Sequence, residues 1–211
     1  MGSRELASVG ADGSAQSGDD NGDGIIEIGP TYRGVMYELT LAAPGAAYLP
    51  TQSTGPLNYT GPFTEYVPPR TVRIVAGTGT TNPTHFTVTG RTYEGATIVD
   101  SITATGAGAF DGHKAMASIT SITSDVPLGG DTDFVTGKGV ALIPALTPPP
   151  SFGLPGDVTE PTSLCRVAVD GVHDSPASLD VGSSTVVPST LANGSKKYVF
   201  LYNSAHDHGT G

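Results

Sequence analysis

Several residue types are scarce in this 211-residue chain, and each shortage excludes a class of protein. Tryptophan is absent, and aromatic residues make up only 7% of the sequence. The single cysteine, Cys165, cannot form an intramolecular disulfide, which excludes a disulfide-stapled secreted domain and favours assembly in a reducing cytoplasm. No apolar run approaches the roughly 18 residues of a membrane span. Residues 1–5 do not have the basic-then-apolar pattern of a signal peptide, so we expect no membrane partner.

Basic residues are few as well. Ten Lys and Arg stand against 20 Asp and Glu, which gives a formal net charge of −10. Residues 1–30 hold six acids and one base, whereas residues 69–145 hold six acids and five bases. Because the sequence has no basic stripe that could displace phosphate counterions, we expect no nucleic-acid partner. The acidic N-terminal region is suited instead to a basic protein surface or a cation.

Glycine and proline are abundant, at 29 and 17 residues, and they favour many turns over long helices. Between residues 71 and 143, short segments rich in Thr, Val and Ile alternate with Gly-containing turns such as 77–79, 106–108 and 129–130. Strands of this length at this spacing predict an all-β fold, an immunoglobulin-like β-sandwich. The expected strands are 71–75, 84–89, 97–103, 112–122 (with a bend near Ser121) and 134–143.

The sequence divides into three parts. Residues 1–68 are predicted to form an N-terminal arm and a Pro-rich connector, residues 69–145 the sandwich, and residues 146–211 a Pro-rich linker with a smaller C-terminal β unit. Six prolines between residues 43 and 69 predict an extended connector on the surface. A connector of this length is unusual inside a compact domain, so we expect its aromatic residues to contact a neighbouring subunit: Tyr48, Tyr59, Phe63 and Tyr66.

Alternating patterns predict strands outside the sandwich as well. In residues 35–41, one face carries Val, Tyr and Leu while the other carries Met36, Glu38 and Thr40. Residues 164–169 also read as a strand. In residues 196–202 aromatic side chains share one face and aliphatic side chains the other. That last pattern predicts a strand buried on both faces, either within the domain or against a neighbour.

The sharpest local motif lies in the acidic N-terminal region. Oxygen-bearing side chains stand at positions 1, 3, 5 and 9 of a calcium-type loop that begins at Asp19, with Gly24 at position 6 and a backbone carbonyl at position 7. Pro30 stands at position 12, where an EF-hand has its closing Glu, so a simple acidic turn remains the alternative. The candidate Ca²⁺ ligands are Asp19, Asn21, Asp23, Ile25 and Glu27.

Patterns that would indicate catalysis are weak, and we expect no enzyme activity. Cys165 alternates with two valines on one strand face, which favours a packed core thiol over a nucleophile paired with His173. His206 and His208 are typical of a solvated terminus. The glycines of 77–79 and 137–139 do not open a helix and are interpreted as turn and bulge residues. Neighbouring carboxylates at 131 and 133 without an aromatic cleft do not indicate a glycosidase.

Five segments, taken in order, resemble tailed-bacteriophage virion proteins. In that family a Val-Thr-Gly segment is followed by a diverging loop, a Gly-x-Lys-Ala segment, a Gly-x-Gly strand and a closing hydrophobic strand. The matching segments of this chain are Phe86–Gly90, Ile98–Ala104, Gly112–Ile122, Thr136–Gly139 and Asn193–Tyr198. Met116 stands where the family more often has an aromatic residue.

The resemblance implies a head decoration (cement) protein that binds the major capsid protein on the outer surface of the capsid, after assembly in the host cytoplasm. It also implies a homo-oligomer, with a trimer as one form. Two alternatives stay open: a minor tail, neck or fibre protein, and a carbohydrate-binding β-sandwich module. In the second alternative, calcium at the acidic loop would support an aromatic surface that stacks on sugars.

Overall fold

The computed structural model describes residues 32–80, 83–146 and 165–205. Every helix or strand in these ranges is a β-strand, and the strands pair only in antiparallel sheets, which confirms the predicted all-β sandwich fold. The strands are β1 (Tyr32–Thr40), β2 (Asn58–Tyr59), β3 (Arg70–Ala76), β4 (Thr84–Arg91), β5 (Thr97–Ala104), β6 (Gly108–Asp111), β7 (Ser118–Ser124), β8 (Thr132–Ala141), β9 (Cys165–Val169), β10 (Val172–Asp174), β11 (Pro176–Asp180), β12 (Thr185–Pro188) and β13 (Lys197–Ala205).

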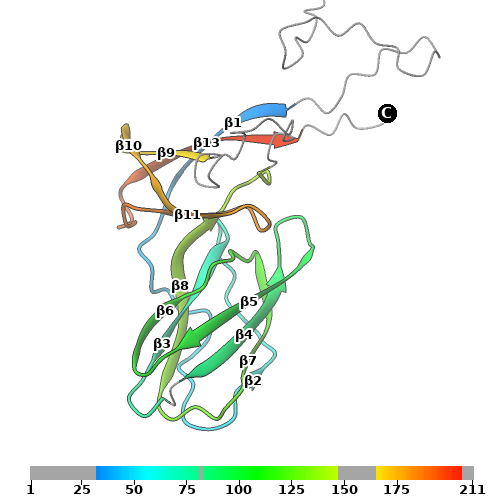
Figure 1. The fold of residues 1–211 in the computed structure, drawn as a ribbon, viewed down its shortest axis with the longest axis vertical. Helices are drawn as coiled ribbons and strands as arrows, with labels where there is room; N and C mark the ends of the chain where they lie inside the picture. The colour runs from blue at the N-terminus through cyan, green and yellow to red at the C-terminus, as the bar shows by residue number, and fades with distance from the viewer. Residues whose placement is uncertain (1–31, 81–82, 147–164, 206–211) are drawn as a thin grey trace, which may run out of the picture.

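Two of the three sheets pack face to face and form the sandwich at one end of an elongated molecule (Figure 1). One sheet has the order β2-β7-β4-β5, and the other has the order β11-β12-β8-β3-β6. Strands β4 and β5 alternate strictly between buried and exposed side chains, as expected for a sheet with one solvated face. Across the interface Phe86 and Phe134 are fully buried, and their rings meet edge to face at 5.9 Å between centroids.

The connector packs on this same sandwich, which corrects the expectation that it lies along a neighbouring subunit. Tyr48 is 2% exposed and belongs to the sandwich core together with Leu49 and Leu57. Tyr59, Phe63 and Tyr66 are partly buried against that core. The prolines keep the connector out of the sheet interiors and limit its pairing to the two-residue edge strand β2, while its large side chains reach inward. Backbone bonds from this segment to β8 hold it in place, for example Tyr48 N to Phe134 O at 2.8 Å.

The C-terminal unit is built on the third sheet, whose strand order is β1-β13-β9-β10. Strand β1 is therefore a member of this unit, although its residues precede the sandwich in sequence. It pairs with β13 over nine consecutive residues without a register shift. A second core lies under this sheet and includes Tyr198, Phe200 and the far end of β8 with Val140. Leu179 of β11 and Val186 of β12 also belong to this core, so these two strands are part of the C-terminal unit although they extend a sheet of the sandwich.

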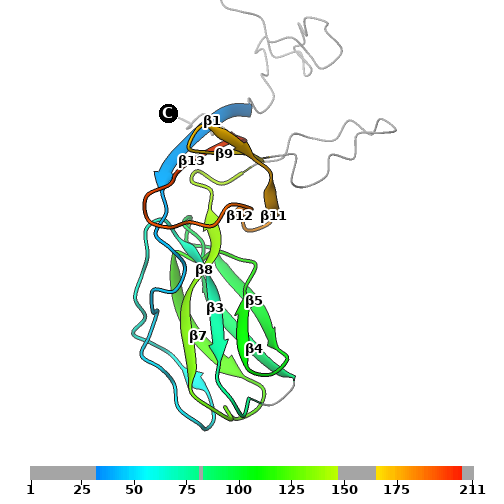
Figure 2. The same cartoon turned by 90° about the vertical axis from the view of Figure 1, so that its left-hand side faces the viewer.

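Within the described residues the predicted strand at 196–202 is buried on one face only, so burial of its other face against a neighbour stays a prediction. Tyr198, Phe200 and Tyr202 are buried, whereas Leu201 is 46% exposed and Val199 is half-buried. No element packs over the outer face of this sheet among the described residues (Figure 2). The aliphatic residues of β13 therefore meet solvent, together with Met36 of β1, which is 70% exposed.

Two further details differ from the sequence interpretation. The segment expected as one strand from 112 to 122 is a strand only from Ser118, and its first part makes an isolated bridge between Met116 and Arg70. The carboxylate of Asp100 accepts bonds from the backbone N–H groups of His113 and Lys114, so this part of the chain bonds to a side chain instead of a sheet. The residues after the turn at 106 form the short strand β6, which was not predicted.

Candidate functional site

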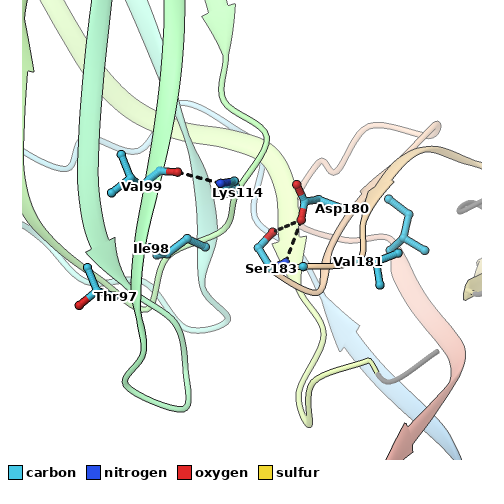
Figure 3. A pocket seen from close by; sticks show the side chains of 9 residues that line it. Thr97, Ile98, Val99, Lys114, Asp180, Val181 and Ser183 are labelled. Carbon is cyan, nitrogen blue, oxygen red and sulfur yellow. Dashed lines mark hydrogen bonds between the residues drawn. The ribbon is translucent and has the colours of Figure 1, made fainter.

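A groove of about 770 Å³ lies between the sandwich and the C-terminal unit (Figure 3). One wall is formed by the start of β5 and Lys114 of the sandwich. The other is formed by the end of β11 and the turn that follows it. The lining residues are Thr97, Ile98, Val99, Lys114, Leu179, Asp180, Val181, Gly182 and Ser183. Both walls combine apolar and polar side chains, with one cation and one anion across the groove from each other.

The charged side chains of the groove are anchored by hydrogen bonds within their own walls. Lys114 Nζ donates to the carbonyl oxygen of Val99 at 2.9 Å. Asp180 Oδ1 accepts from the backbone N–H of Ser183 at 2.8 Å and from its hydroxyl at 3.0 Å. These bonds fix the orientation of both groups, so the groove presents an arranged pattern of donors and acceptors to whatever contacts it.

Buried hydrogen bonds beside the groove link the two units directly. Thr185 of β12 accepts a hydrogen bond at its Oγ1 from the backbone N–H of Ala115, at 2.8 Å. The hydroxyl groups of Ser183 and Thr185 lie 2.9 Å apart and are also bonded to each other. Ala115, Ser183 and Thr185 are all buried. A shift of one unit against the other would break these bonds in a buried setting, which costs about 1–3 kcal/mol for each unsatisfied group.

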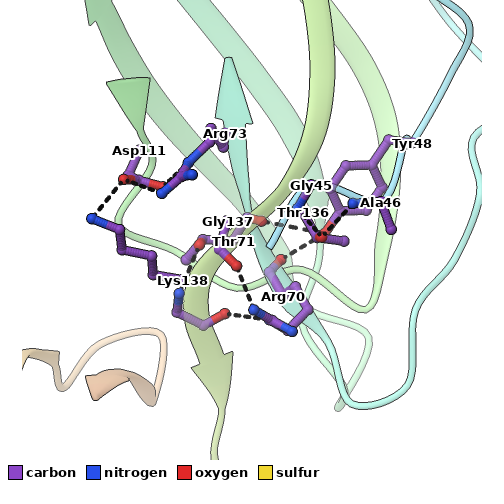
Figure 4. A network of polar contacts seen from close by, with 11 residues as sticks. Gly45, Ala46, Tyr48, Arg70, Thr71, Arg73, Asp111, Thr136, Gly137 and Lys138 are labelled. Atoms are coloured by element: carbon purple, nitrogen blue, oxygen red, sulfur yellow. Dashed lines mark hydrogen bonds and ion pairs between the residues drawn. The ribbon is translucent and has the colours of Figure 1, made fainter. Parts of the chain in front are cut away.

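A second polar cluster lies at the same junction and centres on Arg70 (Figure 4). This residue is 3% exposed, and its guanidinium donates to three backbone carbonyls instead of a carboxylate. The acceptors are Gly139 O at 3.2 Å from Nε, Ala42 O at 3.0 Å from Nη1 and Gly137 O at 2.6 Å from Nη2. Burial lowers the pKa of the Arg70 guanidinium from its ordinary value. The side chain joins the start of β3, the end of β8 and the chain that leads from β1.

The glycines at 137 and 139 make this cluster possible. They were interpreted from sequence as bulge residues, and the register between β3 and β8 does shift between Arg70 and Val72. A Cβ at Gly137 or Gly139 would collide with the side chain of Thr71, whose Oγ1 accepts a bond from Gly139 N at 3.0 Å. Because glycine has no side chain at these positions, the strand can lie close to Thr71, and the carbonyls of both glycines accept hydrogen bonds from the Arg70 guanidinium. The sequence shows the glycine pair but gives no signal that Arg70 is buried beside it.

An exposed charge cluster borders this junction. Arg73 forms a two-point ion pair with Asp111, at 2.7 and 3.0 Å, and Lys138 lies 3.5 Å from the same carboxylate. The side chains involved are 20–38% exposed. Such partly solvated pairs contribute little to stability, about 0–1 kcal/mol. Their main effect is to fix the surface charge pattern across β3, β6 and β8.

The structure separates the residues that sequence reasoning considered as a Cys/His pair. Cys165 faces the second core, whereas His173 lies opposite Ala168 on the outer face of the sheet. The predicted calcium ligands Asp19, Asn21, Asp23, Ile25 and Glu27 lie outside the described residues, as do His206 and His208. The calcium site therefore stays a prediction. Asp133 accepts a bond from the Thr51 hydroxyl at 2.5 Å, and Asp131 is exposed.

We expect Cys165 to be inert toward thiol reagents in the folded protein. Burial raises the pKa of its thiol to about 12, so the nucleophilic thiolate is scarce at neutral pH. Because this pKa is raised, the thiol's contribution to stability is present below about pH 9 and is lost as the pH rises toward 12. At pH 8, Ellman's reagent should detect one thiol in denaturant and none in the native protein over the same period. Rapid labelling of native protein would contradict the buried position.

Comparisons of the chain with protein-family models, with curated proteins and with solved structures gave no match. Within the part of the chain that the structure describes, no helix is long and apolar enough to span a membrane. In the same residues, no group of three or more His, Cys, Asp and Glu side chains is arranged to hold a metal ion.

Proposed function

We propose that this chain is a structural protein of a tailed-bacteriophage virion, of the decoration type, which binds the major capsid protein on the outside of the head. Two features support the proposal. The first is the order of the Thr-, Val- and Gly-rich segments that resemble virion proteins, from Phe86–Gly90 to Asn193–Tyr198. The second, which carries the argument, is how the sandwich and the C-terminal unit are joined.

The two units share a strand, β8. Strand β8 pairs with β3 in the sandwich, and its last residues pair with β12 beside the second core. The backbone bonds of β8 therefore run from one unit into the other (Figure 1). Arg70 and Thr185 add buried hydrogen bonds on two sides of this strand. An elongated body joined in this way suits a protein that bridges neighbouring capsomers, because a rigid binder loses little conformational entropy.

Charge supports the proposal as well, beside the resemblance and the rigid junction. The region from residue 1 to 30 carries a net charge of −5, from six acids and one base. An acidic segment of this kind fits a basic patch on a partner protein and raises the rate of encounter. We expect this segment and the rigid body to bind together, so that two weak contacts on one chain give a stable attachment.

The proposal is tested with particles assembled from the genome that encodes this chain. Particles produced without the chain would be mixed with the purified full-length protein, separated by density-gradient sedimentation and imaged by electron cryomicroscopy. We expect the protein to sediment with the heads and to add density on the outer capsid surface. Density confined to the tail or neck, or no co-sedimentation at all, would contradict a decoration role.

A matched variant separates the acidic segment from the rigid body. A chain without residues 1–30 retains all thirteen described strands, because β1 begins at Tyr32. We expect this variant to stay folded and to bind the particles at least tenfold more weakly, since it loses the acidic region. Binding as strong as that of the full chain would show that the acidic segment does not contribute.

A further inference from the structure

The edge of β1 differs from the other sheet edges that the structure describes. The three sheets have six edge strands: β1, β10, β11, β6, β2 and β5. An edge strand presents unpaired backbone N–H and C=O groups, and proteins normally protect such edges by shortness, bulges, prolines or charged side chains. Among the six edges, five have such protection.

Five of the edges are short, irregular or covered. Strands β2, β10 and β6 have only two, three and four residues. Strand β11 begins with Pro176 and contains a bulge before Ser178. Strand β5 is longer, but Lys114 donates to its Val99 carbonyl, and the chain at 113–114 is bonded to its Asp100 carboxylate. Each of these edges is poorly suited to pair with another strand.

Strand β1 lacks most of these protections. It is nine residues long, contains no proline, pairs with β13 in an unbroken register and carries two charged residues, Arg33 and Glu38. The charge of Glu38 is neutralised by Lys197 of β13, at 2.7 Å. On the outer face Met36 is 70% exposed and lies opposite Leu201, which is 46% exposed. A long, regular edge bordered by exposed apolar side chains is the type of edge that pairs with a further strand.

We propose that β1 pairs antiparallel with β1 of a second copy of this chain, which joins the two C-terminal sheets into one eight-stranded sheet. The observation that selects a second copy is the position of an exposed apolar side chain. Met36, which is 70% exposed, stands at the centre of Tyr32–Thr40, so in a two-fold pair the two methionines cover each other. A two-fold axis through Met36 lets every residue of the strand pair, and keeps the core faces of both copies on the same side of the sheet.

Charge also favours this register. With the axis at Met36, Glu38 of one copy lies opposite Gly34 of the other and Arg33 lies opposite Leu39, so no like charges meet. An axis at Glu38 would bring two carboxylates directly together, which is unfavourable. With the axis at Met36, the exposed methionines of the two copies meet and cover each other beside the two leucines at 201. The dimer therefore buries apolar surface that the single chain exposes. This inference does not depend on the proposed virion role.

The full-length protein, purified alone, provides the test through two single-cysteine variants. In Met36→Cys, the two introduced thiols would face each other at the axis, with Cα atoms about 4.5–5.5 Å apart, which is within disulfide range. In Leu201→Cys, the matched control on the same outer face, the thiols would be three strand spacings apart, about 14 Å. Oxidised glutathione serves as the oxidant and accepts the two electrons that the thiols lose. Cys165 is buried and remains silent.

We expect Met36→Cys to form a disulfide-linked dimer and Leu201→Cys to remain unlinked under the same conditions. Equal linking of both variants would indicate stacking of the two faces or random collision and would overturn the pairing of β1 edges. No linking of either variant, with a monomer in sedimentation, would also overturn it. A non-covalent test uses Met36→Lys, which places two ammonium groups at the axis. This substitution should weaken the dimer about tenfold or more.

Discussion

Replacing Arg70 with methionine is expected to lower the free energy of unfolding by about 3 kcal/mol or more. Methionine fills similar space but donates no hydrogen bonds, so the buried carbonyls of Gly137 and Gly139 lose their partner. Hydrogen bonds to a charged group are worth about 1.5–3 kcal/mol each, and an orphaned buried acceptor adds its desolvation cost. Urea unfolding, followed by far-ultraviolet circular dichroism, measures the change.

Arg91→Met is the matched control for this substitution. Arg91 is exposed and donates to one carbonyl, Gly95 O at 2.9 Å, in the turn between β4 and β5. Its loss should change the unfolding free energy by less than about 1 kcal/mol. Similar losses in the two variants would show that the three carbonyl bonds of Arg70 do not stabilise the junction.

Replacing Tyr48 with alanine is expected to lower the unfolding free energy of the single chain by about 3–5 kcal/mol. The ring is buried in the sandwich core, meets Tyr66 edge to face at 5.1 Å and donates its hydroxyl to Arg70 O at 3.1 Å. Removing it leaves a cavity in the core and detaches the connector. The measurement is urea unfolding at several protein concentrations.

Two controls separate the contributions of Tyr48. Tyr48→Phe keeps the ring and removes the hydroxyl, and should cost only about 1 kcal/mol. Tyr93→Ala changes a tyrosine that is 62% exposed and should stay within about 0.5 kcal/mol of the native protein. If Tyr48→Ala instead left the single chain as stable as the native protein, the connector would belong on a neighbouring subunit, as the sequence alone suggested.

Much of the strand pattern was readable from the sequence because it depends on local features. Thr-, Val- and Ile-rich segments between glycine turns predicted β3, β4, β5 and β8 within two residues of their observed ends. Alternation in residues 35–41 correctly placed Val35, Tyr37 and Leu39 on the core-facing side. Cys165 was also correctly predicted as a core thiol.

What the sequence left undecided depends on partners distant in the chain. Nothing local to residues 35–41 indicates pairing with β13, more than 150 residues later. Proline spacing predicted an extended connector outside the sheet interiors, and its one strand, β2, is a two-residue edge strand, but the surface the connector covers is set by the sandwich beneath it. The pattern of β13 suggested two buried faces, and only the absence of a covering layer among the described elements leaves one face exposed.

The sequence by itself determined that this protein is built from strands, since residue type and a period of two act over a few neighbours. The tertiary structure alone decided which strands meet, where Arg70 finds its acceptors and which edge stays open. These outcomes depend on long-range pairing, in which backbone groups that are chemically alike can bond in many registers until packing selects one.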